Sequence, residues 1–251
     1  MAKISAVIDS DALQFRTHLE VIIPQQPTPA TKVLYLLHGL SDDCTVWGRN
    51  TRIHHFAEKH NYTVIMPEVQ RSFYSDMTHG SKYFTYVAHE LPQTVERLFN
   101  VRHTRENTFV AGLSMGGYGA AKCALSRPDF YAAGASFSGA VDMRSHIEKA
   151  KAERIQISSF PEVYAILGEA LIFPDNAGLF HLANNIPLDS RPRLLITCGD
   201  KDFLLEDNRR FDAHLQTLNY GHKYMEWPGE HNWDFWEECL PLAFDFFEER
   251  N

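Results

Sequence analysis

Apolar positions along the chain follow two spacings, one typical of strands and one typical of helices. Residues 3–8 and 14–23 alternate apolar and polar side chains, which predicts two strands joined as a hairpin. Residues 32–38 form a nearly continuous apolar run, which is typical of a strand covered on both faces in a parallel sheet. The N-terminal part of the chain is therefore expected to build one side of a sheet.

Downstream of residue 50, strand-like and helix-like segments alternate. We expect further strands at 62–66, 107–111, 132–137, 193–198 and 223–227, and helices at 51–60, 86–99, 118–125, 204–218 and 233–249. Short links between such segments require right-handed crossovers, so the sheet should be mostly parallel with helices on both faces. The sequence predicts an α/β fold in a single domain that spans residues 1–251.

Residues 141–190 interrupt this alternation. They start with a charged, helix-like run at 144–154 and continue through short segments rich in Phe and Pro. Because they lie between two predicted core strands, we expect a small cap inserted at the edge of the sheet. The alternative is that these residues form ordinary helices on the face of the sheet.

Composition excludes several classes of function. The 251 residues are 44% apolar and carry a net charge of −8, without a basic run that would suit nucleic acid. No stretch resembles a signal peptide or could span a bilayer, so a cytoplasmic protein is expected, without a membrane partner. The four cysteines are widely separated and are expected to be reduced thiols. No His or Cys spacing matches a metal site, and we expect neither a metal nor another cofactor.

The clearest chemical signal is the pattern G-x-S-x-G at residues 112–116, between a predicted strand and a predicted helix. Such a turn exposes its central side chain, and its glycines permit close approach of the backbone. We therefore predict that Ser114 is a nucleophile. The alternative is a glycine-rich turn that only packs a helix against the sheet.

A serine nucleophile needs a base, and the base needs an orienting acid. In α/β-hydrolases these residues follow the chain order Ser, Asp or Glu, then His, and His231 comes directly after the strand at 223–227. Two acids follow the preceding strand: we predict Asp202 as the orienting acid, and expect Asp200 to cap the turn or to bind loop amides. Two further acids lie within the next helix and are expected to face solvent: Asp207 and Asp212.

The developing negative charge of an acyl-transfer reaction requires backbone N–H donors. One should come from Met115, the residue after the nucleophile, at the start of a helix. The other should come from Leu40, in the loop that follows the strand at 32–38, where Gly39 lets the backbone come close. His38 lies at the end of that strand, and we expect its role to be structural.

Seven segments together resemble the tributyrin-esterase-type members of the esterase D family: 36–40 (LLHGL), 47–51 (WGRNT), 71–76 (RSFYSD), 111–121, 135–140 (ASFSGA), 199–208 and 228–233 (PGEHNW). The resemblance implies an α/β-hydrolase fold, a carboxylesterase activity on short acyl esters and, often, homo-oligomers. Related members include acetylesterases, feruloyl esterases and S-formylglutathione hydrolases. The last carry a cysteine-containing loop after the oxyanion strand, whereas in this chain Cys44 is only loosely placed.

The combined prediction is a serine carboxylesterase that hydrolyses acetyl to butyryl esters of small molecules through an acyl-enzyme. Ser114 would attack, His231 would transfer the proton, and Asp202 would orient His231. The alternatives on the same scaffold are a thioesterase of the S-formylglutathione hydrolase type, a feruloyl esterase and an acyltransferase. A non-catalytic binding protein is a further alternative.

Overall fold

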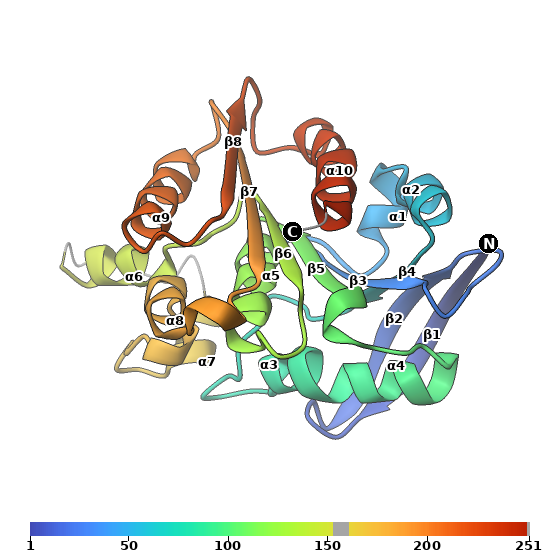
Figure 1. The fold of residues 1–251 in the computed structure, drawn as a ribbon. Coiled ribbons are helices and arrows are strands. Elements are labelled where there is room, and N and C mark those ends of the chain that lie inside the picture. Colours follow the sequence, from blue (N-terminus) through green and yellow to red (C-terminus); the bar gives the residue numbers. More distant parts are fainter. Residues whose placement is uncertain (153–160, 250–251) are drawn as a thin grey trace.

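A single twisted sheet of eight strands runs through the middle of the computed structural model, which describes residues 1–152 and 161–249 (Figure 1). The strand order is β1-β2-β4-β3-β5-β6-β7-β8. β2 pairs antiparallel with β1 and with β4, and all other neighbours are parallel. The strands are β1 (Ala2–Ser10), β2 (Phe15–Ile23), β3 (Lys32–Leu37), β4 (Tyr62–Pro67), β5 (Thr108–Leu113), β6 (Ala133–Phe137), β7 (Arg193–Gly199) and β8 (Lys223–Trp227).

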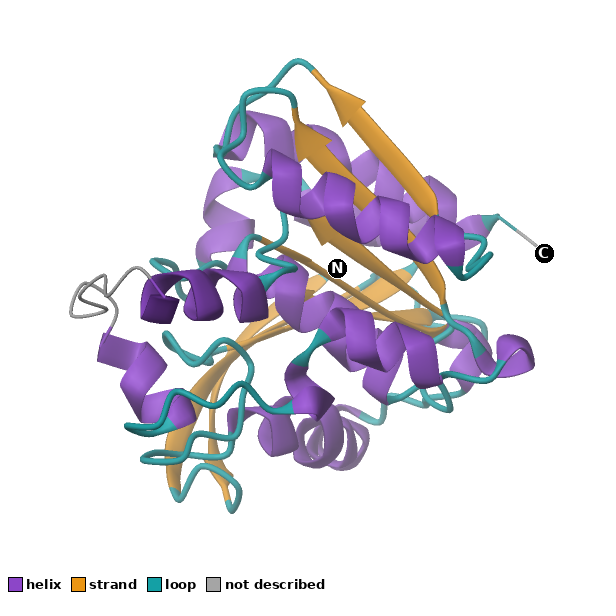
Figure 2. Ribbon diagram, turned by 90° about the vertical axis from the view of Figure 1, so that its left-hand side faces the viewer, coloured by secondary structure: helices purple, strands orange, loops and turns teal. Residues whose placement is uncertain are grey.

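Helices cover both faces of this sheet (Figures 1 and 2). They are α1 (Val46–Asn50), α2 (Ile53–His60), α3 (Tyr83–Thr85), the π-helical turn Tyr86–Glu90, α4 (Leu91–Phe99), α5 (Met115–Ser126), α6 (Met143–Ala152), α7 (Pro161–Leu167), α8 (Leu179–Asn185), α9 (Leu205–Thr217) and α10 (Trp233–Glu248). In β3, Leu34 and Leu36 pack with α2 and α10, whereas Tyr35 and Leu37 belong to the core shared with α4, α5, α8 and α9. The apolar run in β3 is thus explained by burial on both faces. The mostly parallel sheet with helices on both faces confirms the predicted α/β-hydrolase architecture.

The expected strands are all present, and the N-terminal pair is the predicted antiparallel hairpin. One predicted helix is divided: residues 86–90 form a π-helical turn before α4. Pro92 lies at the start of α4 and has no N–H to donate to the carbonyl of Ala88, which accepts instead from Arg127 Nη1 at 2.6 Å. The short helix α1 is not foreseen by the sequence pattern.

Residues 141–190, the predicted cap, contribute α6, α7 and α8; residues 153–160 within them lie outside the described part of the chain. α6 and α7 share a small apolar cluster of their own, with Ile147, Val163 and Leu171 at its centre. α8 packs with the main core beneath α5 and α9. The hydroxyl of Tyr118 in α5 donates to the carbonyl of Ala177 at 2.7 Å, so α5 is linked directly to the segment. None of the helices described is both long and apolar enough to cross a membrane.

Candidate active site

Ser114 occupies the sharp turn between β5 and α5, where the sequence pattern places it. Its backbone has φ 51° and ψ −116°, a conformation that non-glycine residues rarely adopt, and its N–H donates to the carbonyl of Phe137 at 2.9 Å. A Cβ on Gly112 would lie 2.4 Å from the carbonyl oxygen of Gly116. A Cβ on Gly116 would lie 2.4 Å from the carbonyl oxygen of Leu37. These contacts explain why glycine occupies both positions beside the turn.

Three side chains from distant parts of the sequence meet at this turn. The distance from Ser114 Oγ to His231 Nε2 is 3.0 Å, and His231 Nδ1 lies 2.8 Å from Asp202 Oδ2. Ser114 follows β5, Asp202 follows β7 and His231 follows β8, so all three come from the carboxyl ends of parallel strands. The imidazole of His231 packs edge-on against Trp236 at a centroid distance of 4.9 Å, which restricts its rotation.

The carboxylate of Asp202 determines which nitrogen of His231 carries the proton. The side chain of Asp202 is fully buried, and its Oδ1 accepts a hydrogen bond from the Leu204 amide at 2.8 Å. Burial alone would raise its pKa, but the hydrogen bonds from His231 and from the Leu204 amide outweigh burial and lower the pKa. An ionised carboxylate only accepts, so Nδ1 of His231 donates to it, and Nε2 is left to accept a hydrogen bond from the Ser114 hydroxyl.

The other acids near this edge have different partners. Asp200 is exposed, and its Oδ1 accepts from the Gly229 amide at 3.2 Å, as expected for a residue that binds loop amides.

The expectation that Asp207 and Asp212 face solvent is wrong. Asp207 is buried, and its carboxylate binds both Arg210, at 2.7 Å, and His146 of α6. Asp212 is half-buried and accepts from His222 Nε2 at 2.7 Å. Position within a helix gave no sign of this burial, because His146 and His222 lie outside α9.

The loop after β3 lies against the first turn of α5. A Cβ on Gly116 would come within 2.7 Å of the His38 carbonyl oxygen, so the backbone that leads into Leu40 is next to the start of this helix. Met115 is the first residue of α5, and its N–H therefore has no acceptor within the helix. This juxtaposition fits the two predicted N–H donors, Leu40 and Met115.

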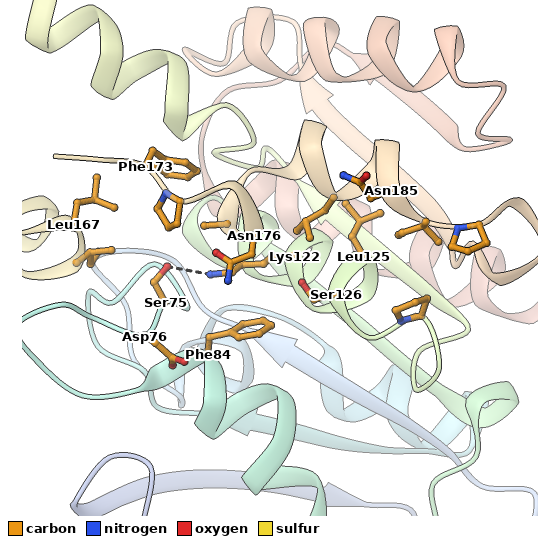
Figure 3. Close-up of a pocket in the computed structure, with 17 residues that line it drawn as sticks. Ser75, Asp76, Phe84, Lys122, Leu125, Ser126, Leu167, Phe173, Asn176 and Asn185 are labelled. Carbon is orange, nitrogen blue, oxygen red and sulfur yellow. Dashed lines mark hydrogen bonds between the residues drawn. The ribbon is translucent and has the colours of Figure 1, made fainter.

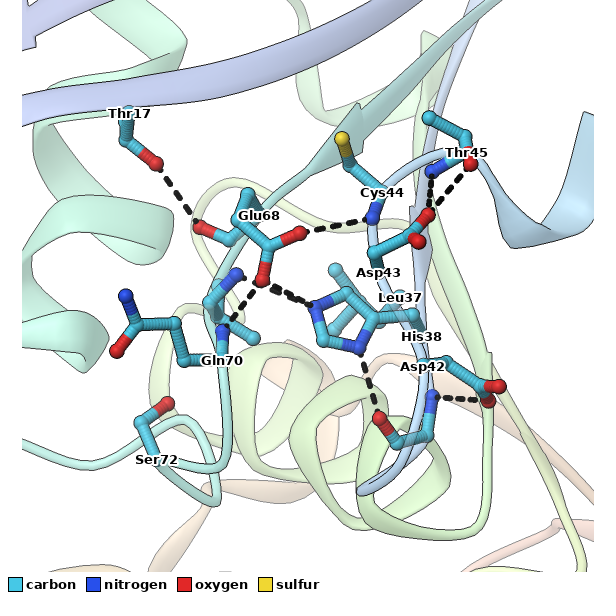
Figure 4. Close-up of polar contacts among 12 residues, drawn as sticks. Thr17, Leu37, His38, Asp42, Asp43, Cys44, Thr45, Glu68, Gln70 and Ser72 are labelled. Atoms are coloured by element: carbon cyan, nitrogen blue, oxygen red, sulfur yellow. Dashed lines mark hydrogen bonds and ion pairs between the residues drawn. The ribbon is translucent and has the colours of Figure 1, made fainter.

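The contacts of His38 hold the loop between β3 and α1 (residues 38–45), which contains the predicted donor Leu40 and is called the oxyanion loop below. It is 1% exposed, and its Nδ1 donates to the carbonyl of Gly39 at 2.8 Å (Figure 4). Its Nε2 accepts from the Val69 amide at 3.2 Å. The hydroxyl of Tyr74 donates to the His38 carbonyl at 2.9 Å. Both ring nitrogens thus bind the main chain, which supports the structural role expected from the sequence.

Glu68 is a residue that the sequence analysis missed. It follows β4, and its carboxylate accepts from the amides of Cys44 at 3.0 Å and Gln70 at 2.8 Å, while lying 3.5 Å from His38 Nε2 (Figure 4). Burial opposes its ionisation, but contact with the His38 imidazole, which is favourable once that ring is protonated, and the hydrogen bonds from the two amides outweigh burial and lower the pKa of Glu68 to about 2. A carboxylate here fastens the loop between β3 and α1 to the loop after β4. The only feature of the sequence that could have pointed to Glu68 is its position just after a predicted strand.

The described residues include no group of three or more His, Cys, Asp or Glu side chains arranged to hold a metal ion. All four cysteines are free and buried. Burial raises the pKa of Cys44, near the oxyanion loop, to about 12, so its thiol stays protonated.

Comparisons with known proteins identify the family of this chain. Residues 10–247 match the Esterase family, described as "Putative esterase". An acetyl esterase from Caldicellulosiruptor saccharolyticus is 30% identical over 224 residues, which cover 87% of this chain and 84% of the relative. Among solved structures, the Staphylococcus aureus fluorophosphonate-binding serine hydrolase FphF superposes with a TM-score of 0.87 at 29% identity, covering 99% of both chains.

A second solved structure, the S-formylglutathione hydrolase FrmB from Staphylococcus aureus, has a TM-score of 0.84 at 30% identity and covers 98% of both chains. The bovine S-formylglutathione hydrolase is 28% identical over 158 residues, which cover 53% of this chain and 55% of that relative. The family match spans nearly the whole chain, including all the strands that carry the predicted site residues. This chain therefore belongs to the Esterase family, and it is a carboxylic ester hydrolase of the serine esterase type.

Proposed function

We propose that Ser114, His231 and Asp202 form the catalytic triad of a carboxylesterase that hydrolyses acetyl to butyryl esters. The observation that carries the proposal is the continuous hydrogen-bond chain, 3.0 Å from Ser114 to His231 and 2.8 Å from His231 to Asp202. The acetyl esterase relative supports the short acyl group.

In the first half of the reaction, His231 Nε2 takes the proton of Ser114 Oγ as this oxygen attacks the ester carbonyl carbon. The carbonyl oxygen becomes an oxyanion, which the amides of Leu40 and Met115 stabilise. When the tetrahedral intermediate collapses, the bond to the alcohol oxygen breaks and His231 gives that oxygen its proton. The products of this half are the free alcohol and an acyl-Ser114 ester.

In the second half, a water molecule attacks the acyl carbon while His231 Nε2 takes one of its protons. Collapse of this second intermediate breaks the bond to Ser114 Oγ, which recovers the proton from His231. A carboxylic acid is released and the enzyme returns to its starting state. Asp202 keeps its negative charge throughout and stabilises the imidazolium that forms in both halves.

A phosphonate ester that reacts with serine tests this assignment. We expect one phosphonyl group per chain, located on Ser114 by peptide mass spectrometry, together with complete loss of p-nitrophenyl butyrate hydrolysis. The acyl preference is tested by comparing kcat/KM for p-nitrophenyl esters of increasing chain length. A maximum beyond butyrate would refute the short-chain assignment, and labelling at another residue would refute the nucleophile.

A thioester hydrolase is the second candidate, because one similar solved structure is the S-formylglutathione hydrolase FrmB. A kcat/KM for S-formylglutathione well above that for acetyl esters would favour it.

Three further predictions stand beside the activity: that residues 141–190 act as a cap, that the protein is cytoplasmic and that it forms homo-oligomers. Deletion of α6 and α7, cell fractionation and light scattering test them in that order.

A further inference from the structure

A cavity of about 530 Å³ lies between α5, the chain around α3, and the segment that contains α7 and α8 (Figure 3). None of the three candidate catalytic side chains is among the residues that line it. Its volume falls within the range of roughly 300–1,000 Å³ typical of small-molecule sites. The cavity is therefore large enough to hold a ligand of its own.

One wall of this cavity contains the ammonium group of Lys122, a residue of α5 that is only 4% exposed. Its Nζ donates to the carbonyl of Tyr74 at 2.9 Å and to Ser75 Oγ at 3.1 Å (Figure 3). The ring centre of Phe84 lies 4.6 Å from the same atom. An ammonium group has three N–H donors, so these two hydrogen bonds leave one donor over.

The charge of Lys122 has no anionic partner in the described part of the chain, where no carboxylate oxygen lies within 4.0 Å of its Nζ; besides its two hydrogen bonds it faces the rings of Phe84 and Tyr118, at 4.6 and 5.6 Å. Asp76 lines the same cavity, but its two oxygens accept from the amide and the hydroxyl of Thr85, at 2.9 and 2.7 Å. Burying an ammonium group without an adjacent anion is unfavourable. Burial lowers the pKa of Lys122 to about 8, which still leaves the amine mostly protonated at neutral pH.

The rest of the lining is largely apolar and is supplied by side chains such as Leu125, Ile166, Phe173 and Ile186. The cavity thus combines one buried cation with an apolar body. We propose that it binds a small monocarboxylate with an apolar chain or ring, whose carboxylate accepts the remaining N–H of Lys122. This site is separate from the proposed catalytic centre and does not depend on the triad.

A monocarboxylate fits this wall better than a phosphate. One cation and one spare donor match a single charge, whereas a phosphate dianion needs several strong donors. The nearby carboxylate of Asp76 would also repel a dianion more than a monoanion. The apolar lining then favours a ligand with a hydrocarbon part over acetate or formate.

The test uses enzyme in which Ser114 has first been blocked with a phosphonate, so that the catalytic centre cannot hold the probe. Binding of hexanoate is measured by calorimetry or ligand-observed NMR, with hexanamide as the neutral probe of the same shape. We expect saturable hexanoate binding and affinity for hexanamide that is lower by roughly tenfold or more, the value of one charge-assisted hydrogen bond.

Two variants locate the site. Lys122→Met keeps the length of the side chain without the charge, and we expect it to weaken hexanoate binding to the level of hexanamide. Lys59→Met, which removes an exposed lysine on α2, is the matched control. After the same phosphonate treatment, it should bind hexanoate as tightly as the chain without a substitution. The proposal would be overturned if the Lys122→Met variant bound hexanoate as tightly as the chain without this substitution. Absence of hexanoate binding to the blocked enzyme would overturn it as well.

A second pair of measurements covers the case in which Lys122→Met does not fold. Ile186→Trp fills the cavity from α8's C-terminal side and should abolish binding while the amine is retained. With the unsubstituted chain, binding should weaken as the pH rises through about 8, where Lys122 loses its proton. The other titratable groups that face this amine are Asp76, Cys123 and Tyr118; burial raises the pKa of the latter two. Unchanged binding in Ile186→Trp, or between pH 7 and 9, would contradict the site.

Discussion

Two histidine–carboxylate pairs lie at the same edge of the sheet, and they differ in what the histidine faces. His231 pairs with Asp202 through Nδ1 and presents Nε2 to the hydroxyl of Ser114. His38 is 1% exposed, and it binds main-chain groups through both nitrogens, with Glu68 3.5 Å from its Nε2. A histidine and a carboxylate do not by themselves determine what such a pair does. The role of each pair depends on the group that contacts Nε2 of the histidine: a serine hydroxyl for His231 and a main-chain amide for His38.

The two carboxylates differ in the same way. Asp202 accepts from His231 with one oxygen and from a single amide with the other, so it orients the side chain that we propose transfers the proton. Glu68 accepts from two amides on separate loops, so it holds backbone in place. We expect substitutions in the first pair to abolish proton transfer, and substitutions in the second to misplace the oxyanion donors.

The largest effect is expected for Ser114→Ala, which removes the proposed nucleophile. We expect kcat for p-nitrophenyl butyrate to fall by at least about 10⁴-fold, because no other group can form the acyl-enzyme. Ser145→Ala, at an exposed position on α6, is the matched control and should keep full activity. Substantial residual turnover in Ser114→Ala would mean that another residue attacks.

The next largest effect is expected for substitution of Asp202, and it distinguishes this residue from Asp200 in the same loop after β7. Asp202→Asn can no longer hold Nδ1 of His231 as the proton donor, so kcat should fall by roughly 10³- to 10⁴-fold with little change in fold. Asp200→Asn keeps the oxygen that accepts from the Gly229 amide, and it should retain near-normal kcat. If Asp200→Asn proved the more damaging variant, the two assignments would be reversed.

Glu68→Gln tests the second pair. The amide keeps one acceptor oxygen but loses the charge, and the oxyanion loop should shift. We expect kcat to fall roughly tenfold to 100-fold, less than for loss of a whole oxyanion donor, with KM nearly unchanged.

The affinity for a boronic acid that mimics the tetrahedral intermediate should fall in proportion to kcat in Glu68→Gln. Glu148→Gln, exposed on α6, serves as its control. A loss confined to thermal stability, with kcat and boronate affinity intact, would make Glu68 a structural residue only.

The smallest effect concerns stability against acid. The pKa of Glu68 is about 2 in the folded chain and near 4.5 when unfolded, so its ionised form favours folding at pH values above 4.5. That contribution, on the order of 1–3 kcal/mol after allowance for partial exposure, is lost as the pH falls from about 5 to about 2. Urea unfolding of the chain and of Glu68→Gln should therefore converge over this interval. A constant difference between them would contradict the lowered pKa.

Local sequence patterns were sufficient to predict the strands of the sheet and the sharp turn at Ser114. The apolar run of β3, the alternation in β1 and β2, and the glycines around Ser114 each reflect a constraint that acts within a few residues: burial on two faces, on one face, or close approach of backbone. Chain order and position after a strand were likewise enough to predict which serine, acid and histidine meet.

Features that depend on partners distant in the sequence could not be predicted in this way. Asp207 is covered by His146 of α6, and Glu68 fastens two loops together because it accepts from the amide of Cys44, which lies 24 residues earlier in the chain. The cavity beside Lys122 arises where α5, which ends at Ser126, meets the segment that contains α7 and α8, which begins at Pro161. The sequence by itself determined the sheet, the sharp turn and which three side chains meet there, because these follow from local sterics and strand order. Only the tertiary structure decided which charged groups are buried and what each one contacts, because those energies depend on neighbours that folding alone brings together.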